Sequence, residues 1–310
     1  MTDKLALFEA ERNRLEAIAY RMLGTQTDAK DIVQETYIKW QASQDVENPP
    51  AWLTTVCSRL ALNQLTSARA QREEYVGVWL PEPLAGATEK TASHQVELDE
   101  TISMAMLVAM EMLSPLERAV FLLHDIFEYR FDEIAEIVGK RADACRQAAS
   151  RARKRLKASK PRFKVDEEIH TRLLQGFMHA AKNGDLDQFK ALLAEDAVLI
   201  ADGGGKASAA LKPLHGPEVI AHFLARVWQN MIRKNVASEW RFHPINGSPG
   251  LMIYQEGKLV TAISLDVHDD RIQTLYAIRN PEKLRNLPPA PEAASETGSE
   301  SLSKTFRDRH

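Results

Sequence analysis

The sequence predicts a multidomain protein in which two all-α parts precede a C-terminal α+β domain. Apolar residues recur at helical spacing through roughly the first half of the 310-residue chain. A proline-rich segment interrupts these helices, and after about residue 238 short alternating runs rich in β-branched and aromatic residues indicate strands. At ~100–200 residues per domain, this length allows two or three domains.

The first all-α part should contain three helices between residues 5 and about 70, the third of which continues from near residue 51 through residue 65. Gly24 separates the first two, and Asn48-Pro49-Pro50 ends the second because proline cannot continue the preceding helix. Periodicity then fades between about residues 72 and 93. The segment Trp79-Leu80-Pro81-Glu82-Pro83-Leu84 reads as an extended linker. A free linker would not need these apolar residues, so we expect the segment to dock on another surface.

The second all-α part shows the layout of a helix-turn-helix. A serine N-cap followed by proline starts one helix at residue 114, a short helix spans 132–138, and a second spans 144–157 after a tight turn. This last helix is strongly basic although the net charge of the chain is -3, and that local stripe indicates nucleic-acid binding. The alternative is an amphipathic surface helix with solvated arginines.

The C-terminal part should start with helices at 165–183 and 185–193 and carry another at 216–231. A glycine-rich loop follows an apolar run at 197–201, and we expect antiparallel strands at 238–242, 250–254, 259–267 and 271–279. The stretch after about residue 287 has the composition of a disordered tail. The acid–base candidates in this part are Asp202, His215, His222 and Asp266. They form no recognisable catalytic motif, so we expect no enzymatic activity and no catalytic residue.

The remaining composition restricts the class of protein. Cys57 and Cys145 are far apart and have no metal or redox spacing, which favours structural thiols. No apolar run approaches the ~20 residues that span a bilayer. The charged N-terminal segment has no signal-peptide core, so a cytoplasmic location without a membrane partner is expected. We expect neither a cofactor nor a metal site.

Two segments resemble the extracytoplasmic-function (ECF) sigma factors of the sigma-70 family. Asp28-Ala29-Lys30-Asp31-Ile32-Val33-Gln34-Glu35 is similar to their core-binding region 2, and residues 113–139 with the following basic helix are similar to region 4. The linker WLPEPL, the loop DGGGK at 202–206 and NPEKL at 280–284 resemble the subgroup with a fused SnoaL-like domain. That subgroup often has aspartate where this chain has Glu282.

The resemblance implies an order of domains and a function. Region 2, a helical bundle, would span residues 1–72, the linker 73–95, region 4 with its helix-turn-helix 96–160, a SnoaL-like (nuclear transport factor 2-like) α+β cone 164–286, and the tail 287–310. The chain would bind RNA polymerase core through its β and β′ subunits and direct it to promoter DNA. An unidentified small ligand could occupy the C-terminal cavity, and no separate anti-sigma factor is required by the sequence.

The resemblance also assigns residues to each contact. Those expected to contact the polymerase core are Asp28, Asp31, Gln34 and Glu35. Those expected at a melted minus-ten element, where a flipped base could be read, are Arg59, Asn63, Arg69 and Arg72. Those expected at the minus-thirty-five duplex are Arg146, Gln147, Ser150, Arg151, Arg153 and Lys154. Arginine can pair with guanine and glutamine with adenine in the major groove, whereas the later basic residues are placed for phosphate.

A third set of residues is expected to regulate the protein by holding the linker. Its members are Trp79, Leu80, Pro81, Glu82, Pro83, Leu84, Asp202, Gly203, Gly204, Gly205, Lys206, Asn280, Pro281, Glu282, Lys283 and Leu284. Two other functions compete with the sigma-factor prediction. One is a ligand-sensing helix-turn-helix regulator that does not bind polymerase, and the other is an enzyme tethered by the helical half. Neither accounts for the DIVQE segment.

Overall fold

The computed structural model of the chain describes residues 4–85, 102–159 and 167–290. The described residues form two compact units. One contains residues 4–74, 102 and 106–159, and the other contains residues 75–85, 103–105 and 167–290. The described linker residues 75–85 therefore belong to the same compact unit as the C-terminal domain.

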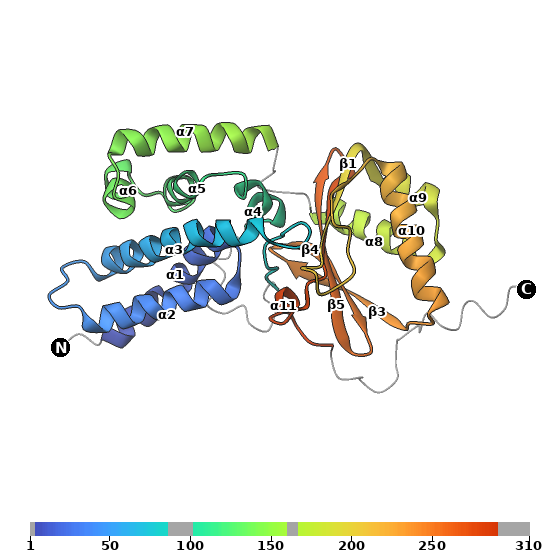
Figure 1. Ribbon diagram of the computed structural model, residues 1–310, viewed down its shortest axis with the longest axis horizontal. Coiled ribbons are helices and arrows are strands. Elements are labelled where there is room, and N and C mark those ends of the chain that lie inside the picture. Colours follow the sequence, from blue (N-terminus) through green and yellow to red (C-terminus); the bar gives the residue numbers. More distant parts are fainter. Residues whose placement is uncertain (1–3, 86–101, 160–166, 291–310) are drawn as a thin grey trace, which may run out of the picture. The chain divides into compact units, whose positions relative to one another are not determined.

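The first unit begins with a three-helix bundle of α1 (Lys4–Leu23), α2 (Gln26–Ala42) and α3 (Pro49–Glu73) (Figure 1). The expected break before α3 is confirmed, and Pro49 is itself the first helical residue, where its missing N–H costs nothing. The helix continues to Glu73, slightly past the expected limit of about residue 70. The apolar spacing expected of α2 agrees with its inward side, where Ile32, Val33, Thr36 and Trp40 are buried and Tyr37 is half-buried.

The same unit continues with α4 (Met104–Met110), whose first two residues fall in the second unit. It then contains α5 (Pro115–Phe121), a π-helical turn (Leu122–Ile126), α6 (Phe131–Val138) and α7 (Ala142–Ser159). The predicted cap is confirmed: the Ser114 hydroxyl accepts from the Glu117 amide at 3.3 Å, and the Glu117 carboxylate accepts from the Ser114 amide at 3.0 Å. Gly139 ends α6 in the left-handed region at φ 65°. The start of the helix expected from residue 96 lies outside the described residues.

The second unit is built on one six-stranded sheet with the order β2-β1-β6-β5-β4-β3. Its strands are β1 (Leu193–Asp202), β2 (Leu214–His215), β3 (Ser238–Ile245), β4 (Ser248–Gln255), β5 (Lys258–His268) and β6 (Arg271–Ile278). The antiparallel run β3 to β6 agrees with the sequence prediction. However, β1 pairs parallel with β6, so the sheet is mixed. The long connection between these two strands permits parallel pairing, which no short hairpin could supply.

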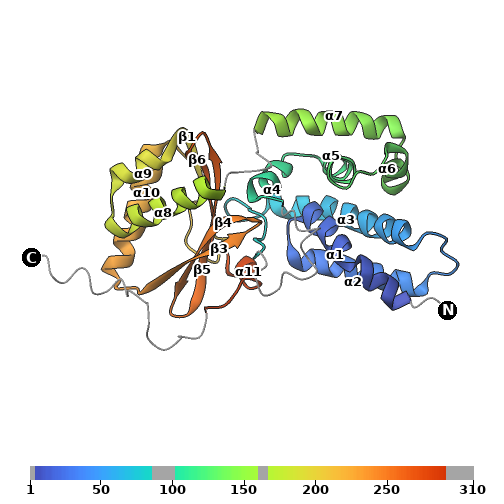
Figure 2. The same cartoon turned by 180° about the vertical axis from the view of Figure 1, so that it is seen from behind.

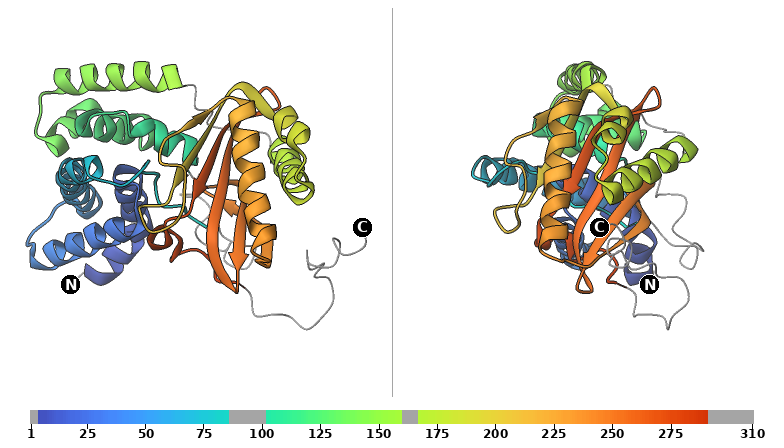
Figure 3. Two further views of the ribbon diagram at one scale, coloured as in Figure 1. Left: turned by 45° about the vertical axis from the view of Figure 1, so that its right-hand side comes forward. Right: turned by 90° about the vertical axis from the view of Figure 1, so that its right-hand side faces the viewer.

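Three helices cover one face of this sheet. They are α8 (Glu167–Asn183), α9 (Leu186–Leu192) and α10 (Pro217–Arg233). Figures 2 and 3 show them on one side, whereas the short α11 (Pro281–Leu284) lies on the other. The core between helices and sheet includes Leu174, Phe177, Phe189, Ile220 and Leu275. Strand β2 and helix α11 were not predicted, because elements of two and four residues carry no readable periodicity.

The chain stays packed on the second unit slightly beyond residue 286. Leu287 is 6 % exposed, and the Tyr254 hydroxyl donates to the Pro288 carbonyl at 3.1 Å. Residues 287 and 288, which were expected to be in the disordered tail, are therefore packed on the domain, and the stretch 291–310 lies outside the described residues. Within the described ranges, no helix is both long and apolar enough to cross a membrane.

Candidate functional sites: a linker-binding site and a nucleic-acid interface

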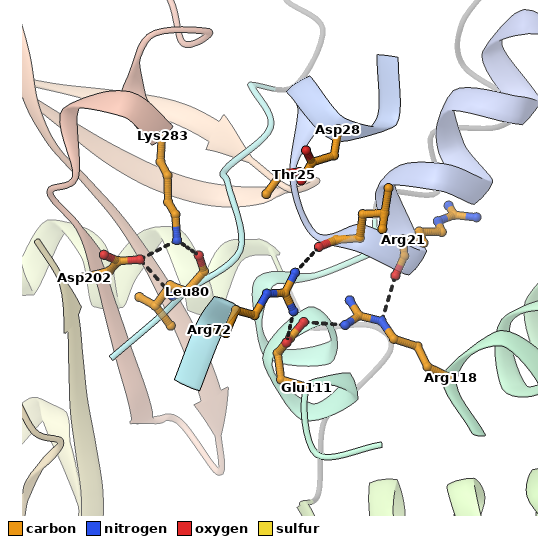
Figure 4. A network of polar contacts seen from close by, with 10 residues as sticks. Arg21, Thr25, Asp28, Arg72, Leu80, Glu111, Arg118, Asp202 and Lys283 are labelled. Carbon is orange, nitrogen blue, oxygen red and sulfur yellow. Dashed lines mark hydrogen bonds and ion pairs between the residues drawn. The ribbon is translucent and has the colours of Figure 1, made fainter. Parts of the chain in front are cut away.

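The linker is held by the carboxylate of Asp202, the last residue of β1. Asp202 is fully buried, and its two oxygens accept from the Leu80 amide at 2.9 Å, the Tyr75 hydroxyl at 2.6 Å and the Lys283 ammonium at 2.6 Å (Figure 4). A buried carboxylate needs a cation and several hydrogen bonds to offset its lost hydration. All of these come from the linker and from α11, so both segments must be in place together.

Lys283 connects α11 to the linker backbone. Its ammonium also donates to the Leu80 carbonyl, and it lies 4.2 Å from the centre of the Trp79 ring. Leu80 thus has both its N–H and its C=O satisfied by charged side chains of the C-terminal domain. A cation over an indole face adds further attraction. With Lys283 only 7 % exposed, the ion pair with Asp202 is a buried one.

The glycine-rich loop after Asp202 has no space for a side chain at Gly203 or Gly204. A Cβ on Gly203 would lie 2.2 Å from the Ala207 carbonyl oxygen. On Gly204, which has φ +57°, a Cβ would lie 2.3 Å from Asn280 Nδ2 and 2.6 Å from the Tyr75 hydroxyl. Gly203 therefore lets the loop fold closely on itself, and Gly204 lets it approach the linker and the NPEKL segment.

The second half of the linker binds elsewhere on the same domain. The Leu84 amide donates to Asn246 Oδ1 at 3.1 Å, and its carbonyl accepts from the Asn246 amide at 2.9 Å. The Glu82 carboxylate, 3 % exposed, accepts from Asn286 Nδ2 at 2.7 Å. Asn246 lies at the tip of the β3–β4 hairpin. Both of its bonds are with the linker backbone, so they fix the path of the linker without requiring leucine at position 84.

The NPEKL segment also caps its own helix. Asn280 Oδ1 accepts from the Glu282 amide at 3.0 Å, and its Nδ2 donates to the Tyr75 hydroxyl at 2.8 Å. Burial and the neighbouring Asp202 raise the pKa of Tyr75. Glu282 is exposed and pairs with Lys206, which lowers the pKa of Glu282 and keeps it ionised. The glutamate at this position therefore pairs with the lysine of the DGGGK loop.

The structure gathers most of the predicted regulatory residues into this one site. The buried members of the three segments are Leu80, Pro81, Glu82, Pro83, Asp202, Gly203, Asn280, Lys283 and Leu284. The half-buried or exposed members are Trp79, Leu84, Gly204, Gly205, Lys206, Pro281 and Glu282. Sequence reasoning missed Tyr75, Asn246 and Asn286. The only signal was the hairpin sequence Asn246-Gly247, which indicates a turn and nothing about a partner.

The four residues expected at the polymerase core lie on α2. Asp31, Gln34 and Glu35 are exposed on the face opposite the buried stripe. Asp28 is half-buried and accepts a hydrogen bond from the Thr25 hydroxyl at the start of the helix. Three of the four side chains are thus placed to meet a partner, and Asp28 serves its own helix start.

Two of the four residues expected at the minus-ten element, all of which lie on α3, already donate hydrogen bonds within the first unit. The Arg59 guanidinium donates to the carbonyls of Ile137, at 3.0 Å, and Glu136, at 2.6 Å, at the end of α6. Arg72 donates to Glu111 and to the Leu23 carbonyl, and burial lowers its pKa. In this arrangement neither guanidinium is available to DNA. Asn63 is exposed, and the side chain of Arg69 lies outside the described part of the structure.

The basic helix α7 presents the predicted reading face to solvent. Its buried side is formed by Cys145, Ala148, Ala149 and Ala152, whose small side chains allow close packing in the helix-turn-helix. The six candidate DNA contacts, all exposed, are Arg146, Gln147, Ser150, Arg151, Arg153 and Lys154. Ile134 and Ile137 provide the buried side of α6, and the half-buried Val138 packs against the same core.

Three of these arginines carry ion pairs within the first unit. Arg146 pairs with Asp143, Arg153 with Asp125 at 2.7 Å, and Arg151 with Glu117 at 3.0 Å. The Arg146–Asp143 pair is exposed on both sides and is worth ~0–1 kcal/mol, so a DNA phosphate can replace that carboxylate at little cost. Arg151 instead pairs with the buried carboxylate of Glu117. The face is therefore exposed and cationic, and Arg146 is its most weakly engaged arginine of the three.

The acid–base candidates do not form a catalytic set. Asp202 binds the linker, His215 is exposed on β2, and His222 is exposed on α10 beside Glu218. Asp266 lies 3.3 Å from His268 on the same strand, away from the other three. In the part of the chain that the structure describes, no three His, Cys, Asp or Glu side chains are grouped to hold a metal ion.

Comparisons with known proteins agree with this architecture. Family models match sigma-70 region 2 at residues 7–71 and sigma-70 region 4 at residues 103–156. The chain is 36 % identical over 305 residues to the ECF RNA polymerase sigma factor SigJ of Mycobacterium tuberculosis, covering 94 % of this chain and 96 % of that protein. It is 28 % identical over 283 residues to the probable ECF RNA polymerase sigma factor SigI of the same species, covering 90 % and 94 %.

The solved structures include a relative of nearly full length. The crystal structure of Mycobacterium tuberculosis SigJ matches with a TM-score of 0.74 and 32 % identity, covering 92 % of this chain and 99 % of that one. A helical bundle, a helix-turn-helix and a C-terminal SnoaL-like α+β domain define the class as a sigma-70 factor with a fused domain. The chain belongs to the ECF RNA polymerase sigma factors.

Proposed function

We propose that this sigma factor binds polymerase core through the exposed face of α2 and promoter DNA through α3 and α7, and that its C-terminal domain regulates it by holding the linker. The observation that carries the regulatory part is the bond between the buried Asp202 carboxylate and the Leu80 backbone. A charge committed to the main chain of another segment is costly to release, so the linker has a defined docked state.

The docked state bears directly on how the two DNA-reading regions are connected. Residues 75–85 follow α3 of region 2 and lead towards region 4. When they are held at both Leu80 and Leu84, the direction and span of this part of the connection are fixed. A linker released from these contacts would give region 4 a wider choice of positions. By binding or releasing the linker, the C-terminal domain thereby controls how far region 4 can move relative to region 2 when the two promoter elements are read.

Packing within the first unit supports a second requirement, that regions 2 and 4 separate at a promoter. Arg59 of α3 donates to α6, and the Arg118 Nε of α5 donates to the Arg21 carbonyl of α1 at 3.1 Å. The minus-ten and minus-thirty-five elements are about 25 base pairs apart, or roughly 85 Å at ~3.4 Å per base pair. Regions in direct contact cannot span that distance, and separation would also release Arg59 for DNA.

Run-off transcription with sigma-free polymerase core tests the proposal. Adding the purified chain should yield discrete new transcripts, and their start sites would give both promoter elements. Asp202→Asn should change the amount of each transcript, whereas the matched exposed variant Asp187→Asn should not. DNA binding with neither core association nor transcripts would instead favour a ligand-sensing regulator. Unchanged transcription with Asp202→Asn would refute the proposed regulation through the linker, but it would not refute the sigma-factor function.

A further inference from the structure

The C-terminal domain contains a cavity that the linker does not use. It has a volume of about 280 Å³ and lies between the helices and the sheet. Its apolar lining includes Phe177, Phe189, Phe223, Trp228 and Trp240. Ligand pockets commonly measure ~300–1,000 Å³ and are mainly apolar with a few polar groups. This cavity therefore suits a small molecule with an apolar body.

The ionisable groups around the cavity all have the same sign. Among its lining residues in the described chain, the charged side chains are Arg226 and Arg279, and none is Asp, Glu, Lys or His. A cavity without a carboxylate or an imidazole has no general acid or base at neutral pH. Two cations around an otherwise apolar space instead favour an anionic ligand.

Arg279 is the cation that most needs such a partner. It is half-buried, it has no ion pair with a carboxylate in the described chain, and its guanidinium donates to the Ser208 carbonyl. Its Nε is buried without a hydrogen-bond partner among the described residues. Burial lowers the pKa of Arg279, which reflects the cost of holding the charge there. Partly buried charges in proteins are normally paired.

A second donor beside the cavity is also unsatisfied. Trp228 lines the cavity from α10 and is only 7 % exposed, and its indole N–H has no acceptor among the described residues. Its ring packs at 90° against Trp240, with ring centres 5.7 Å apart. Buried tryptophan N–H groups usually find an acceptor. The cavity wall therefore offers a cation and a neutral donor without an anion to receive them.

We propose that this cavity binds a small apolar carboxylic acid as its anion. The carboxylate pairs with Arg279 and accepts from the Trp228 indole after small side-chain rotations. The apolar body lies among Phe177, Phe189 and Trp240. Arg226 is exposed, so Arg279 supplies the one half-buried guanidinium, and a single charge matches a monocarboxylate better than a dianionic phosphate. No bond is made or broken, so the site is one for binding.

Calorimetric titration of the full chain with octanoate, octanol and octylamine tests this site. Octanoate should bind about 10-fold or more tightly than the other two, because only it pairs with the guanidinium. Arg279→Gln should weaken octanoate by about 10-fold or more and leave octanol unchanged. Arg279→Lys should restore part of the loss. The control Arg172→Gln removes an exposed arginine of the same domain, paired with Asp270, and should have no effect.

A second variant tests the location. Ala277→Leu adds bulk to the cavity wall without altering either arginine, and it should abolish binding of both octanoate and octanol. Circular dichroism would show that each variant is folded. Equal affinity for the three probes, no octanoate binding by the unaltered chain, or octanoate binding that survives both Arg279→Gln and Ala277→Leu would overturn the proposal. Because the readout is binding, the result does not depend on whether the linker regulates transcription.

Discussion

The carboxylate of Asp202 accepts a 2.9 Å hydrogen bond from the backbone amide of Leu80, which lies 122 residues earlier in the chain. Lys283 binds both partners, since its ammonium pairs with Asp202 and donates to the Leu80 carbonyl. Three distant segments therefore meet at one buried ion pair. Losing any one of them leaves a charge or a backbone group unpaired, which makes docking of the linker cooperative.

Asp202→Asn should release the linker without unfolding the sheet. The variant leaves the Lys283 ammonium buried without its anion and turns one of the two acceptor oxygens into a donor. Breaking a buried ion pair on one side costs about 3–5 kcal/mol, which weakens docking of the linker by a comparable amount. Hydrogen exchange of the Leu80 amide should therefore become much faster. Asp187→Asn, at an exposed site on α9, should leave it slow, and equal protection in both variants would contradict the cooperative site.

A pair of glycine variants separates steric contact from backbone strain. Gly204 and Gly257 have similar positive φ values of +57° and +74°, so alanine is strained at either position. Only at Gly204 would the new Cβ meet other atoms, namely Asn280 and Tyr75, whereas nothing lies within 4 Å at Gly257. Gly204→Ala should expose Trp79 to a fluorescence quencher, and Gly257→Ala should lower the melting temperature slightly with no change in quenching. The same quenching in both would mean that the loop does not touch the linker.

The contact between regions 2 and 4 depends on a carboxylate shared by two arginines. Glu111 pairs with Arg72 and with Arg118, whose side chain is 2 % exposed. Glu111→Gln leaves these two cations close together without an anion, so we expect a loss of about 3 kcal/mol or more. Hydrogen exchange should rise in α5 and at the end of α6, where Arg59 of α3 contacts the carbonyls of Glu136 and Ile137. Glu9→Gln, which removes an exposed pair with Arg12 on α1, provides the control and should change neither.

The faces of single helices could be predicted from the sequence, and the contacts between distant segments could not. Periodicity correctly placed the buried stripe of α2 and the exposed arginines of α7, because burial follows a fixed spacing within one helix. The apolar linker correctly indicated a docked segment. Tyr75 carried no such signal, since its partner Asp202 is 127 residues away.

The same limit explains the other differences. The parallel pairing of β1 with β6 depends on the path of the whole domain and not on either strand. Arg59 and Arg72 were predicted at DNA, but the sequence of a basic helix surface does not distinguish a phosphate acceptor from a backbone carbonyl, which α6 provides for Arg59 and α1 for Arg72. The Asp202–Lys283 pair could be predicted only as two motifs that meet, with no indication that they share one buried charge.

The buried His170 should make the C-terminal domain less stable in mild acid. It is 1 % exposed on α8, and burial lowers its pKa. The unfolded chain takes up this proton near pH ~6.5, whereas the folded chain resists it. Stability is therefore unaffected above that pH and falls as the pH decreases below it, by at most about 1.4 kcal/mol per pH unit, until the folded pKa is reached. Urea unfolding of His170→Leu should show a flatter dependence between pH 7 and 5, while His222→Leu, at an exposed site, should retain the slope.

Arg279 connects the cavity to the linker-binding site, because it lines the cavity and its backbone bonds to Asp202. This connection gives the last prediction. The Arg279 amide donates to the Asp202 carbonyl at 2.7 Å, while its guanidinium holds the Ser208 carbonyl in the loop that continues from DGGGK. A carboxylate bound at Arg279 would compete for that guanidinium and loosen the loop. Octanoate should therefore speed hydrogen exchange at Leu80 in the unaltered chain and have no effect in Ala277→Leu. If octanoate binds and the Leu80 amide exchanges as before, then the cavity site is real but is not coupled to the linker; if exchange slows, then the ligand strengthens docking instead.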